Sequence, residues 1–354
     1  MKKMPALVTV MTIGFLIWML LACRLKHPTI TTDPFKKDSY GFSRRSDRIF
    51  FHEEVLDQVD ANSFEVLDAN FCKDQDRVFY FRNYRDGRDY FLTKKHSIEN
   101  LQVMDVGSFT SLGYGYAKES KQAWFENTSF TVSDIHSLMV IDRDFIKDNH
   151  SVYVDRKLIN GIEGKSFELI DHDYAKDNHH YYYLSRSEEN EKKISIIACD
   201  YQSYIILDYP FSKDAQYVYF EGKKINGVNG KDFVVLGHQY GKDHHAVYFQ
   251  SKQVMGADPA TFSIFPENAH IVLDVSFAKD KNHIYINEKQ FQGVDIASFK
   301  ILNEKYTLDK NGIYYQMKKI KHADPASFAV YPHFVGDADA YDKNHQYGEG
   351  KIVQ

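Results

Sequence analysis

Residues 277–302, which read FAKDKNHIYINEKQFQGVDIASFKIL, contain the repeat that decides the fold. In this stretch Asp280 is followed by Tyr285 after five residues and by Phe299 after nineteen residues. The same two spacings recur in four other segments, whose acidic residues are Asp148, Asp214, Asp243 and Asp309. The shortest interval between successive acidic positions is 29 residues. Self-similarity at such a period predicts one small structural repeat stacked along the chain.

Weaker copies of the same repeat fill the rest of residues 40–354. The acidic position is held by Asp74, Asp177 and Asp342 in three of them, and by Arg45 and Glu119 in two others. Some intervals exceed 29 residues, which indicates loops inserted into an otherwise constant repeat. The largest insertion, around residues 83–100, contains an Asp-Gly turn signal and is expected to form a longer hairpin. We therefore expect about ten repeats, of which the first three and the fifth are divergent.

The residue types at each repeat position predict its local structure. Residues 283–286, His-Ile-Tyr-Ile, are rich in β-branched and aromatic types and are typical of a short strand. The preceding residues 280–282, Asp-Lys-Asn, indicate a tight turn in which the carboxylate accepts backbone N–H groups and the Lys is solvated. Gly256 and Gly293 lie six residues before the Phe, where a positive φ or a close backbone approach is expected. The Asp that follows is expected to begin a loop or single helical turn ending at Ser-Phe.

Aromatic residues supply most of the large apolar side chains, since the chain has 25 Tyr and 26 Phe. We interpret Tyr285, Phe299 and their counterparts as a core that stacks one repeat on the next in a continuous ladder. A carbohydrate-binding surface, the alternative, would need these rings to be exposed. The sequence therefore predicts an all-β fold of tandem β-meanders, each of about three short strands, stacked as an open solenoid or superhelix. A closed, propeller-like ring is the alternative.

The N-terminal segment has the layout of an export signal. Lys2 and Lys3 precede an apolar run that extends from Pro5 to Ala22. Residues 20–23, Leu-Leu-Ala-Cys, resemble the lipobox of bacterial lipoproteins, in which the Cys is acylated and becomes the first residue after cleavage. The resemblance implies a signal peptide over residues 1–22, a lipid on Cys23 and a linker over residues 23–39. An uncleaved transmembrane helix is the alternative, because about 18 apolar residues can span a bilayer.

Either N-terminal structure places the bulk of the chain outside the cytoplasm. Arg24 follows Cys23, and in a Gram-negative host of the enteric type this resembles sorting to the outer membrane. We therefore expect a lipid-anchored protein of the cell envelope that faces the periplasm from the outer membrane. The cell surface and the inner membrane are alternatives.

Charge and cysteine content exclude two further classes. The formal net charge is −5, with acidic and basic residues well mixed, which does not predict the basic surface that binds nucleic acid. Besides Cys23 the chain contains only Cys72 and Cys199. These two fall in different repeats and at different repeat positions, so we expect buried free thiols rather than a disulfide.

The array resembles the DKNYY repeat family of exported bacterial proteins. The resemblance rests on residues 280–285 (Asp-Lys-Asn-His-Ile-Tyr), 309–315 and 342–344, together with the Gly-x-Asp-x2-Ser-Phe tail. The literal pentapeptide is absent, and the first three repeats are degenerate. The resemblance covers nearly all of the chain after the N-terminal segment. It implies the repeat architecture and no established activity.

Patterns that would indicate catalysis fail at their decisive positions. Residues 52–56 begin like a zincin motif but end in Leu56, where the second His ligand is needed. Residues 164–166, Gly-Lys-Ser, resemble the end of a P-loop, yet Ile159 stands where the first Gly is required. We therefore predict no catalytic residues, no cofactor and no enzymatic activity.

Six histidines that share two repeat positions are the best metal candidate. They are His150, His179 and His245 at one position, and His180, His283 and His345 at the next. Neutral imidazoles can bind zinc or copper. The columns are interrupted by Gln216, Asp76 and Gly312, however, and turn tips commonly hold polar residues. We therefore predict solvated turns and no metal site.

The sequence thus predicts a non-enzymatic, membrane-anchored envelope lipoprotein whose repeats bind a protein partner. One specific form of this function is an immunity protein against a toxin delivered to the periplasm. The alternatives are a structural cell-envelope factor, an envelope hydrolase and a glycan-binding protein. The expected partners are the membrane, through the lipid on Cys23, and a protein, with no nucleic acid. No binding residue is identified by the sequence.

Overall fold

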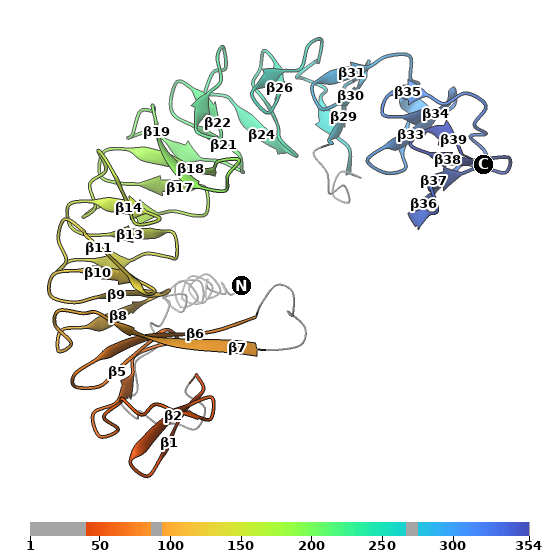
Figure 1. Ribbon diagram of the computed structural model, residues 1–354. Coiled ribbons are helices and arrows are strands. Elements are labelled where there is room, and N and C mark those ends of the chain that lie inside the picture. Colours follow the sequence, from red (N-terminus) through yellow and green to blue (C-terminus); the bar gives the residue numbers. More distant parts are fainter. Residues whose placement is uncertain (1–39, 86–93, 267–274, 354) are drawn as a thin grey trace, which may run out of the picture. The chain divides into compact units, whose positions relative to one another are not determined.

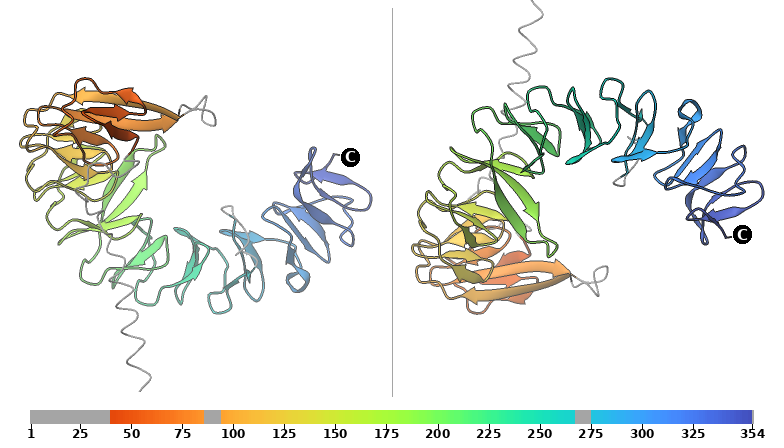
Figure 2. Two further views of the ribbon diagram at one scale, coloured as in Figure 1. Left: turned by 90° about the horizontal axis from the view of Figure 1, so that it is seen from below. Right: turned by 90° about the horizontal axis from the view of Figure 1, so that it is seen from above.

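The computed structural model describes residues 40–85, 94–266 and 275–353. The chain divides into two compact units, residues 1–165 (the N-unit) and residues 166–354 (the C-unit). Each unit is a series of small antiparallel sheets (Figure 1; Figure 2). The predicted signal peptide, Cys23 and the linker lie outside the described residues. No helix within the described ranges is long and apolar enough to cross a membrane.

The N-unit contains four sheets in its described part. The first sheet has three strands, β1 (Phe42–Arg45), β2 (Arg48–Phe51) and β3 (Glu54–Val55). The other three sheets have four strands each: β4 (Glu65–Val66), β5 (Phe71–Lys73), β6 (Val78–Arg85) and β7 (Lys94–Leu101); β8 (Thr110–Gly113), β9 (Tyr116–Lys118), β10 (Ala123–Phe125) and β11 (Thr128–Phe130); β12 (Met139–Val140), β13 (Phe145–Lys147), β14 (Val152–Val154) and β15 (Lys157–Ile159).

The C-unit contains six four-stranded sheets in its described part. The first three are β16 (Glu168–Leu169), β17 (Tyr174–Lys176), β18 (Tyr181–Arg186) and β19 (Lys192–Ile197); β20 (Ile205–Ile206), β21 (Phe211–Lys213), β22 (Val218–Phe220) and β23 (Lys223–Lys224); β24 (Val234–Gly237), β25 (Tyr240–Lys242), β26 (Val247–Phe249) and β27 (Lys252–Gln253). The last three are β28 (Ser263–Ile264), β29 (Phe277–Lys279), β30 (Ile284–Ile286) and β31 (Lys289–Phe291); β32 (Lys300–Ile301), β33 (Tyr306–Asp309), β34 (Gly312–Tyr315) and β35 (Lys318–Lys319); β36 (Ala329–Val335), β37 (Ala338–Tyr341), β38 (Gln346–Gly348) and β39 (Lys351–Ile352).

Every strand pairing among the described residues joins strands that are consecutive in the sequence, and all of these pairings are antiparallel. Each four-stranded sheet is therefore a β-meander whose edges are its first and fourth strands. Within each unit, the predicted all-β fold of tandem β-meanders stacked as a solenoid is confirmed. The expected strand number of about three is wrong for nine of the ten described sheets, which have four strands each. The fourth strand was missed because it is short, exposed and polar, as in β23 and β27, and lacks the aromatic and β-branched residues typical of strands.

Insertions lengthen individual hairpins of these meanders. In the N-unit β6 and β7 pair over eight residues each, and in the C-unit β18 and β19 pair over six residues each. The predicted long hairpin is confirmed in its two strands. Its turn signal at residues 86–88 falls outside the described residues.

The core lies between neighbouring sheets. In β26, Tyr248 packs with Phe211 of the preceding sheet, whereas Val247 and Phe249 pack with Tyr285 of the following sheet. Adjacent side chains of a strand point to opposite faces, so the middle strands contribute to the layer on each side of their sheet. Within each unit the rings therefore form one layer between neighbouring sheets, instead of the continuous ladder that we expected.

The core role predicted for the aromatic positions is confirmed. Tyr285 is fully buried, and its ring lies 5.5 Å from that of Phe262. Phe299 is also buried and packs in the next layer with Tyr314. Burying a ring of this size stabilises the fold by about 1.5–3 kcal/mol, and a short repeat has few other large apolar side chains to bury.

A positive φ explains the repeated glycine. Gly256 and Gly293 both have a φ of 76°, and a Cβ on Gly293 would meet nothing within 4 Å. The left-handed conformation, rather than a close backbone approach, is therefore the reason for the glycine. His322 occupies the same position in the repeat of Asp309 with a φ of 67°, a conformation that costs an ordinary residue about 1–2 kcal/mol.

Candidate functional site

Each typical repeat is organised around a buried carboxylate in the turn between its second and third strands. In eight repeats this residue is an Asp that is only 1–7% exposed: Asp74, Asp148, Asp177, Asp214, Asp243, Asp280, Asp309 and Asp342. Its Oδ1 accepts the backbone N–H groups of the residues two and three positions later, at 2.6–3.0 Å. The carboxylate thus closes the turn that begins the third strand, as predicted.

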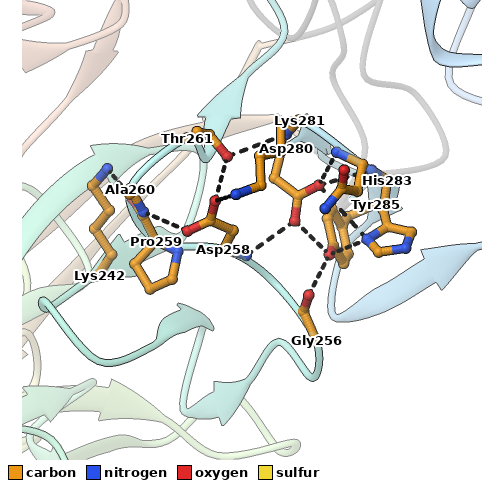
Figure 3. Close-up of polar contacts among 11 residues, drawn as sticks. Lys242, Gly256, Asp258, Pro259, Ala260, Thr261, Asp280, Lys281, His283 and Tyr285 are labelled. Atoms are coloured by element: carbon orange, nitrogen blue, oxygen red, sulfur yellow. Dashed lines mark hydrogen bonds and ion pairs between the residues drawn. The ribbon is translucent and has the colours of Figure 1, made fainter.

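Asp280 shows the complete arrangement (Figure 3). Its Oδ2 accepts the hydroxyl of Tyr285 at 2.9 Å and the backbone N–H of Asp258 at 3.0 Å. Asp258 lies in the tail turn, which we define as the segment between the fourth strand of one sheet and the first strand of the next. One carboxylate therefore holds its own turn, its own third strand and the connection from the preceding sheet.

The same contacts recur along the chain. The Tyr hydroxyl donates to the Asp carboxylate in six repeats, at 2.6–3.0 Å. The N–H of an Asp in the tail turn donates to the buried Oδ2 in six repeats, at 2.5–3.0 Å. With two further N–H donors at Oδ1, a buried carboxylate receives four hydrogen bonds, which offset the cost of removing its charge from water.

The tail turn is closed by its own Asp. Asp258 accepts the N–H of Ala260 at 3.1 Å and the hydroxyl of Thr261 at 2.9 Å (Figure 3). In the next tail turn the Asp295 carboxylate caps the 3₁₀ turn η2 (Ile296–Ser298), so of the loop or single helical turn predicted through Ser-Phe, the helical turn forms here. Lys281, expected to be solvated, keeps its side chain 61% exposed and forms an ion pair with Asp258 at 3.1 Å.

The lysine that directly precedes the buried acid also serves the tail turn. Nζ of Lys242 donates to the carbonyl oxygen of Pro259 at 2.7 Å, and Lys213 donates to that of Phe233 at 3.1 Å. Lys118 reaches three carbonyl oxygens of residues 135–138 in the same way. These lysines satisfy carbonyl groups that have no strand partner, so their charge is used by the fold.

The hydrogen bonds set the protonation state of the network. Burial raises the pKa of Asp280, but the donated hydrogen bonds outweigh it and hold that pKa below its usual range. The same balance brings the pKa of Asp342 to about 2. Burial and the adjacent Asp309 carboxylate raise the pKa of Tyr314 to about 12. The acid is therefore ionised and the phenol neutral at neutral pH, as the O–H donation requires.

Among the described repeats, the repeat of Asp243 lacks both contacts to Oδ2. Oδ1 of Asp243 accepts the N–H groups of His245 and Ala246, but its buried Oδ2 has no hydrogen-bond partner in the described part of the chain. Asn229 stands where the tail Asp is usual, and Asp232 replaces the Ser. A buried oxygen left without a donor destabilises a fold by about 1–3 kcal/mol, so this repeat is held less firmly than its neighbours.

The predicted histidine columns do not form a metal centre. Nδ1 of His180, His283 and His345 lies 3.6–3.8 Å from the buried Asp of its own repeat. His150 and His245 are exposed at their turns. Across residues 40–85, 94–266 and 275–353, no group of three or more His, Cys, Asp or Glu side chains is arranged to hold a metal.

The other sequence candidates have structural roles. His52 and Glu53 form the turn between β2 and β3, with φ values of 48° and 72°. A Cβ on Gly164 would lie 2.1 Å from the carbonyl oxygen of Asp148, so the Gly-Lys-Ser segment requires its glycine for packing. Cys72 and Cys199 are both free, Cys72 buried and Cys199 half-buried, and burial raises the pKa of both thiols.

The described surface includes two shallow hollows that contain polar side chains. One, of about 290 Å³, is lined by Gly41, Phe42, Ser43, His52 and Glu53. The other, of about 320 Å³, is lined by residues 303–305, residues 330–333 and Asp339. Asp339 is engaged there by the hydroxyl of Tyr306 at 2.6 Å.

The sequence predicted the backbone hydrogen bonds that the buried acid accepts within its own turn. It did not predict the hydrogen bonds that Oδ2 accepts from the Tyr hydroxyl and from the tail turn. The signals were present: the Asp-to-Tyr spacing of five residues never varies in the typical repeats, and Lys precedes the Asp in most of them. The constant spacing and the preceding Lys were both interpreted only as parts of a strand. Their link to the tail turn requires knowing how consecutive sheets are connected in space.

Comparison with known protein families confirms the resemblance seen in the sequence. The model of the DKNYY family matches residues 42–186, 188–276 and 211–351. The chain belongs to the DKNYY family. In this chain the signature of the DKNYY family falls on the turn of the buried Asp and on the Tyr strand that follows it. Comparison with curated proteins gives no match, and comparison with solved structures gives none either.

Replacing Asp280 by Asn is expected to lower the free energy of unfolding by about 2–4 kcal/mol, because an amide N–H group would face the donors of Asp258 and Tyr285. Asp243→Asn is the matched control, since its Oδ2 has no donor to lose, and its expected loss is below about 1 kcal/mol. Urea unfolding followed by circular dichroism measures both. Equal losses would contradict the role of Oδ2.

The lowered pKa values predict a defined acid-sensitive window. A carboxyl whose folded pKa lies below its unfolded value of about 3.9 stabilises the fold above that value and loses its contribution as the pH falls through the folded pKa. Asp148, Asp214, Asp280 and Asp342 all have lowered pKa values. The urea midpoint is expected to be constant from about pH 7 to 5 and to fall between about pH 4 and 2. An unchanged midpoint at about pH 3 would refute this account.

Proposed function

We propose that the chain is a membrane-anchored lipoprotein of the bacterial cell envelope whose repeats bind a protein partner without catalysing a reaction. The anchor rests on the lipobox resemblance at residues 20–23 and on the apolar run that precedes it. The binding role is supported by how the fold uses its recurring polar groups. The buried Asp, the Tyr hydroxyl and the paired lysines are engaged within the array, so recognition falls to its edges and insertions.

The observation that carries the binding role is the first-strand edge of the C-unit. Ile205 of β20 is 49% exposed, and Val234 of β24 is 50% exposed. Each of these strands pairs with a neighbour on one side only. An edge strand offers free backbone N–H and C=O groups, and an extended segment of another protein can pair with it. Tyr209, which follows β20, is 54% exposed and adds the kind of side chain that protein interfaces favour.

The specific form that we propose is an immunity protein that binds a toxin delivered to the periplasm. A structural envelope factor is the alternative, and it would bind no single protein tightly. A hydrolase would need a hollow with carboxylates, and the hollow that contains Glu304 and Asp339 is one of this kind. A glycan-binding protein would have to use exposed rings such as Tyr114 and Tyr209, since the recurring rings are in the core.

The binding edge is tested by a photo-crosslinking amino acid placed at Ile205 or Val234 in intact cells. We expect the crosslinker at either position to form an adduct with the same protein. When the crosslinker is at Val234, the additional substitution Ile205→Asp is expected to abolish that adduct. Leu158 of β15, which is 50% exposed on a fourth strand of the N-unit, is the matched control position. No adduct from the two edge positions, or the same adduct from Leu158, would contradict the assignment.

The anchor is tested separately by metabolic labelling with an alkyne-tagged palmitate. The wild-type chain is expected to incorporate the label, and Cys23→Ala is expected to lose it and to remain unprocessed. Cys72→Ala is the control, because that thiol is fully buried in the array. Persistent labelling of Cys23→Ala would show that the lipid is not on this residue.

A further inference from the structure

The lysines of the C-unit separate into groups by what their ammonium groups contact. The lysines before the buried acids, such as Lys213 and Lys242, donate to carbonyl oxygens of the tail turns. The lysines after the buried acids, Lys281, Lys310 and Lys343, form ion pairs with tail-turn carboxylates at 2.7–3.1 Å. Both groups are accounted for by the fold.

A third group lies on the fourth strands. The strands β19, β23, β27, β31, β35 and β39 contain nine lysines and no acidic residue: Lys192, Lys193, Lys223, Lys224, Lys252, Lys289, Lys318, Lys319 and Lys351. We call this set the lysine edge. It is a local basic feature of a chain whose formal net charge is −5.

Most ammonium groups of the lysine edge are not used by the fold. Six of the nine are exposed and form no hydrogen bond or ion pair with the described residues: Lys193, Lys223, Lys289, Lys318, Lys319 and Lys351. The other three are engaged: Nζ of Lys192 donates to the carbonyl oxygen of His172 at 3.4 Å, Lys252 pairs with Glu288 at 3.5 Å, and Nζ of Lys224 lies 3.0 Å from the centroid of the Tyr217 ring. The edge therefore presents unpaired positive charge at a recurring position in successive repeats.

Exposed aliphatic side chains accompany these lysines. Ile196 of β19 is 55% exposed, Met255 directly beyond β27 is 71% exposed, and Ile352 of β39 is 47% exposed. A surface that combines cationic side chains with exposed aliphatic ones suits the boundary between lipid headgroups and acyl chains. A soluble polyanion would interact with the lysines but would make no use of the exposed aliphatic side chains.

Protection of an open sheet edge is the simpler explanation of such lysines, because charge discourages pairing with another chain. It predicts lysines on both edges of each meander. The first strands of the same six sheets contain one lysine, Lys300, and expose Ile205 and Val234. Edge protection therefore does not explain why the lysines lie on one edge only.

We infer that the lysine edge of the C-unit docks on anionic phospholipid headgroups of the membrane to which the chain is anchored. This inference rests on the proposed anchor, which places the edge beside a bilayer. Glu188, Glu189 and Glu191 precede β19, and Glu221, Glu288 and Glu349 precede three other strands of the edge, so these acids reduce the attraction there. The lysines of the edge outnumber them, and each cation near an anionic surface contributes to binding. With the lysine edge on the membrane, the opposite edge of each meander is left for the protein partner.

The test uses the full chain incorporated through its N-terminus into vesicles of phosphatidylcholine, with or without phosphatidylglycerol. An amine-reactive ester labels exposed lysines, and mass spectrometry gives a rate for each residue. We expect Lys223, Lys289 and Lys318 to react about fivefold more slowly on the phosphatidylglycerol vesicles, and high salt to abolish the difference. The matched controls are Lys281, Lys310 and Lys343, whose side chains are 61–66% exposed and whose rates should be equal on both vesicles.

Equal rates for the lysine edge on both vesicles would overturn the inference. Slower labelling caused by soluble polyphosphate, with none caused by phosphatidylglycerol, would also overturn it, because the edge would then bind a polymer. Flotation separates these outcomes from failure of the anchor. A chain that does not float with phosphatidylcholine vesicles lacks the anchor. If such an unanchored chain floats with phosphatidylglycerol vesicles, its flotation reports on the lysine edge alone. This flotation must then be lost when Lys223, Lys289 and Lys318 are all replaced by Gln.

Discussion

A buried carboxylate that accepts four hydrogen bonds is the interaction on which the rest of the structure depends. In its complete form, at Asp280, two donors come from its own turn, one from Tyr285 of the third strand and one from Asp258 of the tail turn. A buried charge is tolerated only when it is hydrogen-bonded in this way. The carboxylate therefore imposes a single path on the chain as it passes from one sheet to the next. The aromatic layer between the sheets can form only when that path is followed.

The consequence for function is that most recurring polar residues are occupied by the fold. The Asp, the Tyr hydroxyl, the lysine before the Asp and the tail-turn Asp contact one another or nearby backbone groups. What distinguishes one meander from the next lies at its two edges and in its insertions. In the C-unit these edges differ in chemistry, since the first strands expose Ile205 and Val234 and the fourth strands expose lysines. The two proposals for function follow from this difference.

Much of the repeat could be predicted from sequence because it depends on local interactions. The Asp turn, the positive φ of Gly293 and the capped turn at Asp295 involve residues only a few positions apart. The fourth strand could not be predicted, because β23 is two lysines that become a strand only by pairing with β22. The backbone donor to Oδ2 of Asp280 could not be predicted either, since this donor belongs to Asp258, which is 22 residues away across an insertion. The sequence likewise does not show that Oδ2 of Asp243 lacks the contacts made by its counterparts.

Native-state hydrogen exchange tests the central role of the carboxylate most directly. The backbone N–H groups of Asp258 and Asp295 lie outside the strand ladders and donate to a buried carboxylate. They should therefore exchange as slowly as strand amides such as that of Ile284. Asn229 occupies the same repeat position without such an acceptor, so its amide should exchange at least about a hundredfold faster. If the amides of Asp258 and Asp295 exchange as fast as that of Asn229, the carboxylate does not hold the sheets together.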